Sequence, residues 1–522
     1  MTSRSILVKL SNGCGFNLLN GIGLNRPLFF LLASVIVFIA LVLFLILNFR
    51  ENSSPSLVSP ILLYCAAGIK PPVEMVARDY EAKYNCKIDI QYGGSGTLLS
   101  NLKVAGIGDL YIAADESYVE IARQQNLVEE VIPLAVMTPV IAVPKGNPKG
   151  VHSIQSLLDD NCKIALGNPD AASIGRVSKK LLTDSGDWPT IKEHATVFYP
   201  TVPEIANSVK LGATDAGIVW DATVDQYVEL DLVRVSELEL GSQRTTIGVL
   251  KTAKDPATAL RFARYLAARD RGLIQFKNYG YMPVIGDVWM EKPEILFFSG
   301  GGNRPAVERT IQGFETREGI KVTSVYNSCG ILVSQIREGE KPDAYFACDV
   351  SFMIQVQSLF DNSTDISETD IVILTKKNNP KQILNLRDLA QGGLRLGVAN
   401  ADQSALGDLT RRMLQAEGVY DDIIKNVRVE TPTADLLVNQ LLAGLLDAVI
   451  VYEASCANVL GNLELIHLNL SSAKAIQSIA VGRRSDRKHM ANRLLEAIQS
   501  PQSQITFESI GFRWIRNRDK GI

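Results

Sequence analysis

The feature that most constrains this fold is an internal repeat. Residues 65–118 align without a gap on residues 299–352 at a constant offset of 234, and 15 of the 54 aligned positions are identical. Unrelated stretches of average composition would share roughly three. The identities include Gly68/Gly302, Pro71/Pro305, Val73/Val307, Glu74/Glu308, Tyr92/Tyr326, Gly96/Gly330, Asp109/Asp343 and Asp115/Asp349. A repeat of this length predicts two copies of one structural unit.

The repeat extends almost to the end of the chain. At an offset of 232, GNPDAASIGRVSKKLL (167–182) faces ANADQSALGDLTRRML (399–414), and DAGIVWDA (215–222) faces DAVIVYEA (447–454). The sequence therefore predicts a tandem duplication. The expected boundaries are a first unit at 61–288, a linker at 289–293, a second unit at 294–514 and a tail at 515–522.

Within each unit, apolar runs alternate with amphipathic helical patterns. In the first unit the expected strands and helices are the strand 61–67, the helix 71–84, the strand 87–92, the helix 97–106 and the strand 109–115, whose Asp115 can cap the next helix. Such alternation predicts an α/β fold with mostly parallel sheets flanked by helices. We expect each unit to have two lobes, in the first unit 61–137 plus 246–284 and 140–240, with crossover strands at VIAVPKG and TTIGVLK. Ligands of such sheets bind at the carboxyl ends of strands.

An uncharged segment, LFFLLASVIVFIALVLFLIL, occupies residues 28–47. Twenty apolar residues are enough to cross roughly 30 Å of hydrocarbon. A cleaved signal peptide is the alternative, but its apolar region is normally about 7–15 residues. Arg4, Lys9 and Arg26 precede the segment, so the positive-inside tendency places residues 1–27 in the cytoplasm. We expect a transmembrane anchor at 28–48, a linker at 49–60 and the remaining chain on the periplasmic side of the cytoplasmic membrane.

The amino-acid composition argues against several functional classes. With 53 Lys+Arg against 56 Asp+Glu the net charge is -3, so nucleic acid is not an expected partner. Seven cysteines without a Cys-x-x-Cys pair and four histidines without His-x-x-x-His spacing argue against a disulfide framework and a zinc site. Neither paired carboxylates nor a nucleophile–base arrangement nor a cofactor fingerprint stands out. We therefore expect no enzyme activity, no cofactor and no metal other than that of a metal oxyanion.

Two glycine-containing loops join strands to helices. They are Ala67-Gly68-Ile69 and Gly93-Gly94-Ser95-Gly96. Amides at a helix N-terminus attract anions, and Ser95 adds a hydroxyl. The simpler alternative is that the glycines only permit tight turns and Ser95 only caps a helix. No Gly-Lys-Ser/Thr follows, so this is not a nucleotide-binding loop.

Each unit resembles the periplasmic molybdate-binding proteins, which are type II solute-binding proteins of ABC importers. The resemblance rests on the order and spacing of CAAGIKPPVEM, YGGSGTL, DLYIAAD, GNPDAASIG, GIVW and RFARYLAARDRGLIQFKNYGY. It implies that neutral hydroxyls and amides hold a tetrahedral oxyanion between two lobes, and that closure is read by a permease.

The resemblance also implies five ligand positions in each unit. In the first unit, Ser95 matches a serine, Gly68 stands where the family has another serine, and Trp220 stands where it has a tyrosine. Ile174 and Val202 match backbone-amide positions. The second-unit counterparts are Gly302, Cys329, Leu406, Ala434 and Tyr452. Tyr452 restores the tyrosine, whereas Cys329 replaces the serine with a weaker donor. Lys70 and Arg304 follow the glycines and either supply positive charge or are simply solvated.

Three functions remain open. The first is a membrane-anchored receptor that delivers a molybdate- or tungstate-like oxyanion to an ABC importer. The second is a receptor or sensor for sulfate, phosphate, ferric iron or an organic anion. Ferric-binding relatives would use paired tyrosines, so the lone Tyr452 argues against iron. The third is an interaction scaffold that has lost ligand binding, an alternative that Trp220 and Cys329 keep open.

Overall fold

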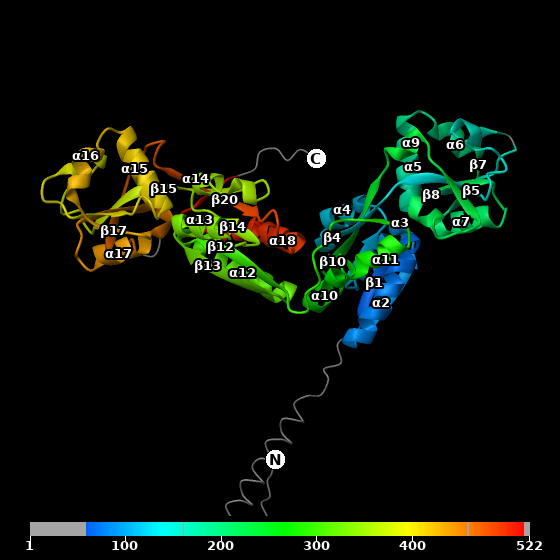
Figure 1. Ribbon diagram of the computed structural model, residues 1–522, viewed down its shortest axis with the longest axis horizontal. Coiled ribbons are helices and arrows are strands. Elements are labelled where there is room, and N and C mark those ends of the chain that lie inside the picture. Colours follow the sequence, from blue (N-terminus) through cyan, green and yellow to red (C-terminus); the bar gives the residue numbers. More distant parts are fainter. Residues whose placement is uncertain (1–58, 160, 457–458, 516–522) are drawn as a thin grey trace, which may run out of the picture. The chain divides into compact units, whose positions relative to one another are not determined.

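The computed structural model describes residues 59–159, 161–456 and 459–515 (Figure 1). Among these residues, no helix combines the length and apolar character needed to cross a bilayer. The expected anchor at 28–48 and the segments beside it, 1–27 and most of 49–60, lie outside the described residues.

The first lobe of the first unit is built on a six-stranded sheet in the order β11-β4-β10-β3-β1-β2. Its strands are β1 (Ile61–Ala66), β2 (Ile88–Gly93), β3 (Leu110–Ala113), β4 (Val128–Met137), β10 (Gln243–Leu250) and β11 (Met282–Pro283). Its helical elements are η1 (Ala67–Ile69), α2 (Lys70–Tyr84), α3 (Ser95–Ala105), α4 (Glu116–Gln124), α10 (Pro256–Leu266) and α11 (Gly272–Asn278). The elements expected between residues 61 and 115 are all present, and Asp115 caps α4 by accepting from the Ser117 amide at 2.8 Å.

The second lobe has a five-stranded sheet in the order β7-β6-β8-β5-β9. Its strands are β5 (Pro139–Pro144), β6 (Ile164–Gly167), β7 (Ala195–Tyr199), β8 (Ala216–Trp220) and β9 (Leu230–Val233). Its helical elements are η2 (Gln155–Leu158), α5 (Ser173–Asp184), α6 (Trp188–His194), α7 (Val202–Lys210), α8 (Asp221–Val224) and α9 (Ser236–Glu239). The two separate sheets confirm that the first unit is bilobed.

The second unit repeats this element order, but one ten-stranded sheet runs through both lobes. Its strands are β12 (Glu294–Gly300), β13 (Lys321–Asn327), β14 (Ala344–Phe346), β15 (Thr364–Lys376), β16 (Leu396–Ala399), β17 (Val427–Thr431), β18 (Ala448–Tyr452), β19 (Leu463–His467), β20 (Lys474–Val481) and β21 (Arg513–Trp514). The long β15 joins the lobes, because its first half pairs with β20 and its second half with β18.

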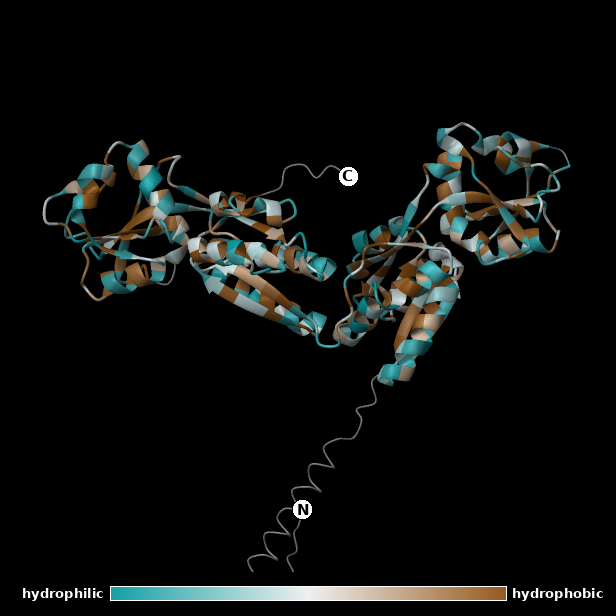
Figure 2. Cartoon of the chain, viewed as in Figure 1, coloured by the Kyte–Doolittle hydropathy of each residue, from teal (hydrophilic) through white to brown (hydrophobic). Residues whose placement is uncertain are grey.

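Helical elements cover the sheets of the second unit as they do in the first. They are η3 (Gly301–Asn303), α12 (Arg304–Glu318), α13 (Cys329–Glu338), α14 (Val350–Ile354), η4 (Gln357–Leu359), η5 (Leu386–Ala390), α15 (Ala405–Ala416), α16 (Tyr420–Ile423), η6 (Ile424–Asn426), α17 (Ala434–Leu442), η7 (Glu453–Ser455), α18 (Lys488–Ile498) and α19 (Pro501–Ser509). Figure 2 shows the apolar residues concentrated on the strands and on single faces of the helices. The apolar faces of helices and strands therefore pack together to form the buried core of each unit.

The expectation of mostly parallel sheets is wrong. In the first unit β1 pairs in parallel with β2 and β3, and β6 with β7 and β8. The pairings of β10 with β3 and β4, and of β5 with β8 and β9, are antiparallel. The sheets are mixed because the chain leaves one lobe and later returns, which inserts strands running in the opposite direction.

The crossing points are shorter than expected. The predicted crossover strands are β5 and β10, and each lies within a single sheet. The chain instead crosses at Thr138 and at Ser242, whose hydroxyl oxygens lie 2.8 Å apart. Thr138 N–H also donates to Asp221 Oδ1 at 3.1 Å. Two single-residue crossings held side by side are suited to a hinge.

Several identities between the repeats are structural. Asp109 Oδ2 accepts from the Leu62 amide at 2.8 Å, and Asp343 Oδ2 accepts from the Leu296 amide at 2.9 Å. Asp349 caps α14 as Asp115 caps α4. These carboxylates satisfy amides at strand and helix ends, so their repetition reports a shared fold rather than a shared ligand.

Asp447 is another carboxylate at a repeated position, and Arg395 surrounds it with donors. It accepts from the Arg395 amide at 3.0 Å, from Nε at 3.1 Å and from a terminal guanidinium nitrogen at 2.8 Å. These hydrogen bonds lower the pKa of Asp447 to about 2. The ionised carboxylate therefore stabilises the fold above its ordinary pKa of about 4, and this contribution is lost as the pH falls from there toward about 2.

We therefore predict that Asp447→Asn lowers the free energy of unfolding at pH 7 by about 1.5–3 kcal/mol. The difference from the wild type should shrink when denaturation is repeated at pH 3 and pH 2, because the wild-type carboxylate becomes protonated. The exposed Asp422, paired only with Lys425, provides the control Asp422→Asn, which should change stability little. A difference that stays constant with pH would contradict the assignment.

Candidate functional site

Four of the five expected positions in the first unit line one small cavity. Gly68 lies in η1, Ser95 begins α3, Val202 begins α7, and Trp220 ends β8. Ile174 is buried in α5 and does not line the cavity, which its neighbour Ser173 lines instead. The cavity volume is about 10 Å³. That is room for about one water molecule.

Ser95 is the best-placed hydrogen-bonding side chain of this cavity. Its Oγ accepts from the Ser173 hydroxyl at 2.8 Å and from the Ala114 amide at 3.2 Å. A hydroxyl has two acceptor sites and one proton to donate. Both acceptor sites of Ser95 are therefore used, which leaves its proton for a guest.

Trp220 lines the same cavity as Ser95. The side chain is fully buried, and its indole N–H has no hydrogen-bond partner among the described residues. A buried donor without a partner costs roughly 1–3 kcal/mol. Trp220 is therefore a cavity-lining residue whose indole N–H is free to donate within the described part of the chain.

The two lobes of the first unit touch at the glycine loop. The Gly96 amide donates to the Ala171 carbonyl at 2.9 Å, so this amide serves the contact between lobes rather than a ligand. A Cβ on Gly94 would overlap the carbonyl oxygens of Ala171 and Pro200. These glycines are therefore required for close approach, and the first unit is closed.

In the second unit all five expected positions line one larger cavity. Gly302, Cys329, Leu406, Ala434 and Tyr452 lie around a volume of about 510 Å³. The lobes again meet through a glycine amide, from Gly330 N–H to the Gln403 carbonyl at 3.0 Å. The two units thus share the glycine contact between lobes, but their cavities differ greatly in volume.

A second cysteine, absent from the sequence-based set, joins this cavity. The Cys348 amide donates to Cys329 Sγ at 3.1 Å, as the Ala114 amide does to Ser95 Oγ in the first unit. Hydrogen bonds from the Cys348 thiol and amide lower the pKa of Cys329, although burial opposes them. The Tyr452 hydroxyl is buried without a partner among the described residues, and burial raises the pKa of this phenol.

The basic residues beside the glycines are engaged elsewhere. Lys70 Nζ lies 5.0 Å from the Tyr92 ring centre, and Lys70 does not line the first cavity. Arg304 lines the second cavity, but it pairs with Glu308 at 2.9 Å and lies over the Tyr326 ring. The structure favours the solvated alternative for Lys70.

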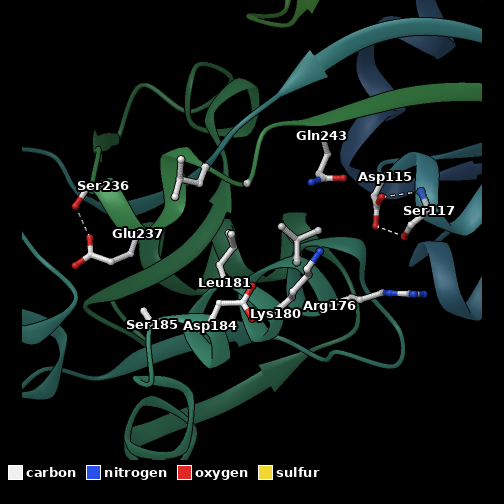
Figure 3. Close-up of a pocket in the computed structure, with 13 residues that line it drawn as sticks. Asp115, Ser117, Arg176, Lys180, Leu181, Asp184, Ser185, Ser236, Glu237 and Gln243 are labelled. Atoms are coloured by element: carbon white, nitrogen blue, oxygen red, sulfur yellow. Dashed lines mark hydrogen bonds between the residues drawn. The ribbon is translucent and has the colours of Figure 1, made fainter. Parts of the chain in front are cut away.

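A different groove of about 710 Å³ lies on the first unit, between the start of α4 and helices α5 and α9 (Figure 3). Its charged residues have both signs, including Arg176, Lys180 and Asp184, and none of the expected ligand positions lines it. Asp115 in this groove is occupied by the Ser117 hydroxyl and amide. The groove therefore does not coincide with the expected ligand positions.

Among the described residues, one group of at least three His, Cys, Asp or Glu side chains lies close enough together to hold a metal ion, formed by Asp370, Glu453 and His467. Both carboxylate oxygens of Asp370 accept from Arg513, at 2.7 and 2.8 Å. An ion pair thus already uses this carboxylate, and we assign no metal to the cluster.

The fold and the paired clefts define a bilobed binding protein present twice in one chain. The chain belongs to the bacterial extracellular solute-binding protein family, whose sequence pattern matches residues 61–281 and again residues 295–513. The two matches confirm the tandem duplication and the resemblance to type II solute-binding proteins.

Individual relatives match one unit at a time. A binding protein of Haemophilus influenzae is 26% identical over 223 residues, which are 43% of this chain and 91% of that protein. An ABC transporter substrate-binding lipoprotein of Bacillus subtilis is 26% identical over 229 residues, 42% of this chain and 85% of that protein. The Escherichia coli molybdate-binding protein is 20% identical over 138 residues, 25% of this chain and 54% of that protein.

The contact between lobes predicts the effect of adding a methyl group. In Gly330→Ala the new Cβ would lie 2.5 Å from the Gln403 carbonyl oxygen, so the lobes must separate. We expect a loss of about 1–3 kcal/mol in stability and a larger radius of gyration in X-ray scattering. The control Gly313→Ala lies in α12 with nothing within 4 Å of the new Cβ, and it should be neutral or stabilising. Equal behaviour of the two variants would contradict a tight contact.

Proposed function

We propose that this chain is a membrane-anchored, periplasmic receptor that captures a molybdate- or tungstate-like oxyanion between the lobes of its first unit and delivers it to an ABC importer. The observation that carries the proposal is the convergence of uncharged donors on one cavity. Ser95 and Ser173 come from different lobes, and the Trp220 indole N–H lacks a partner. The names of the Bacillus and Escherichia relatives support the transport role and the ligand class.

Binding requires the first unit to open. A tetrahedral oxyanion is larger than the water-sized cavity, so it must displace the hydrogen bond between Ser173 and Ser95. Both hydroxyls would then donate to the anion. The crossings at Thr138 and Ser242 are the natural hinge, and ligand binding would shift the population of open and closed forms.

A second candidate function has an observation of its own. With Trp220 in place, the closed first cleft holds only about 10 Å³. This volume favours a first unit that no longer binds a ligand and serves as a scaffold. Sulfate, phosphate and organic anions remain alternative ligands of a receptor.

Calorimetric titration of the full chain with molybdate, tungstate, sulfate and phosphate separates these functions. We predict that at least one anion binds and that Ser95→Ala weakens it by about 1–3 kcal/mol, since one donor to a dianion is lost. Ser100→Ala removes a hydroxyl of α3 that bonds to the Gly96 carbonyl outside the cavity, and should leave affinity unchanged. No heat from any of the four anions would favour the scaffold.

The proposed topology is tested in spheroplasts. An anchor at 28–48 with residues 49–522 outside predicts that external protease removes both units and leaves a short membrane-bound fragment. Protection of the units would overturn the periplasmic location, and release of intact units without protease would indicate a cleaved signal peptide.

A further inference from the structure

Two thiols meet in the cleft of the second unit. Cys329 begins α13 and Cys348 follows β14, and both are buried and line the cavity. Both sulfurs reach the space above Gly300, because a Cβ there would overlap Cys348 Sγ and lie 2.9 Å from Cys329 Sγ. The amide of Cys348 donates to Cys329 Sγ at 3.1 Å.

The first unit shows what changed to make this pair. The counterparts of Gly300, Cys329 and Cys348 are Ala66, Ser95 and Ala114. A thiol at 348 needs the space that the Cβ of an alanine at 300 would take, so the glycine and the cysteine form a matched change. The hydrogen bond is kept in both units: the amide of Ala114 donates to Ser95 Oγ, and the amide of Cys348 donates to Cys329 Sγ. Only the acceptor atom changes, from oxygen to sulfur.

The same cleft has lost oxygen donors. Ala405 stands where the first unit has Ser173, and Cys329 replaces Ser95. A thiol is a weak hydrogen-bond donor, so these two positions donate less well to a hard oxyanion than their first-unit counterparts, although Ser328, Ser404 and Thr433 also line the cavity. Tyr452 lines the same cavity from the other lobe, and its hydroxyl is buried without a partner among the described residues.

The position of Cys329 on its helix favours a thiolate, whereas the hydrogen bond to Cys329 and burial raise the pKa of Cys348, so its proton leaves only when a metal ion takes its place. Cys329 is the first residue of a ten-residue helix, where the helix dipole favours negative charge. Thiolate ligands select soft metal ions such as Cu(I) over hard cations. The Tyr452 oxygen, on a residue that lines the same cavity, is a further and weaker potential ligand.

We propose that the cleft of the second unit binds a soft, monovalent metal ion of the Cu(I) class through Cys329 Sγ and Cys348 Sγ, with the Tyr452 hydroxyl facing the ion. Binding forms two metal–sulfur bonds and releases the two thiol protons to solvent, and no electron is transferred. The proposal concerns the second unit and does not depend on oxyanion binding by the first.

The test uses the full chain, reduced and kept free of oxygen. Ag⁺ serves as a redox-inert probe, and Cu(I) affinity is measured by competition with a chromophoric chelator. We expect one tight equivalent per chain, a thiolate-to-metal absorbance in the ultraviolet and the release of two protons.

The two cysteine variants replace each cysteine with the residue at the equivalent position of the first unit. Cys329→Ser and Cys348→Ala should each weaken Cu(I) binding by at least about a hundredfold, since even outer-shell changes cost about 10–100-fold. Tyr452→Phe should weaken it less. The control Cys162→Ala removes a buried thiol of the first unit and should leave affinity unchanged.

A measurement on the wild type avoids any folding defect of the variants. Bound Ag⁺ should protect Cys329 and Cys348, but not the other cysteines, from alkylation after brief denaturant pulses, as read by mass spectrometry. Three results would overturn the proposal: no tight equivalent, equal binding by the Cys329→Ser/Cys348→Ala double variant, or alkylation of both thiols in the presence of Ag⁺. If the double variant still releases heat when molybdate is added, oxyanion binding does not depend on these two cysteines.

Discussion

The close approach of two lobes through a glycine amide organises each half of this protein. Gly96 in the first unit and Gly330 in the second donate to carbonyls of the opposite lobe at 2.9 and 3.0 Å. A side chain at either position would meet carbonyl oxygen, which cannot yield as a flexible side chain can. Because this contact lies beside Ser95 and Cys329, it also sets the distance across which any ligand must be held.

Much of the fold follows from local signals. The expected strands and helices between residues 61 and 115 are present because their apolar periodicity and the Asp115 cap are local. The direction of strand pairing is not local, and so the antiparallel pairings of β10 and β5 with their neighbours were missed. An apolar strand has the same pattern in either direction. Its direction depends on how often the chain passes between lobes.

Ligand binding by the candidate residues stays a prediction, but the structure shows which of them lie together. The repeat offset placed all five second-unit positions around one cavity, and four of five in the first. Cys348 was missed because its counterpart Ala114 contributes no side-chain donor. The sequence did hold a signal for Cys348, but it requires two positions to be compared at once: Ala66 and Ala114 of the first unit correspond to Gly300 and Cys348 of the second. Only the structure shows that these positions share one volume.

Duplication explains how one chain can hold two dissimilar clefts. Each unit keeps the carboxylates that satisfy strand ends, such as Asp109 and Asp343, because losing one leaves a buried amide without a partner. The cleft residues differ more between the units. Ser95 and Cys329 each accept from a backbone amide, whereas the polar atoms of Trp220 and Tyr452 have no partner among the described residues. Trp220 and Tyr452 stand at the same strand end, yet one cleft holds about 10 Å³ and the other about 510 Å³. The two units therefore share one structural frame, while their clefts differ in volume and in the residues that line them.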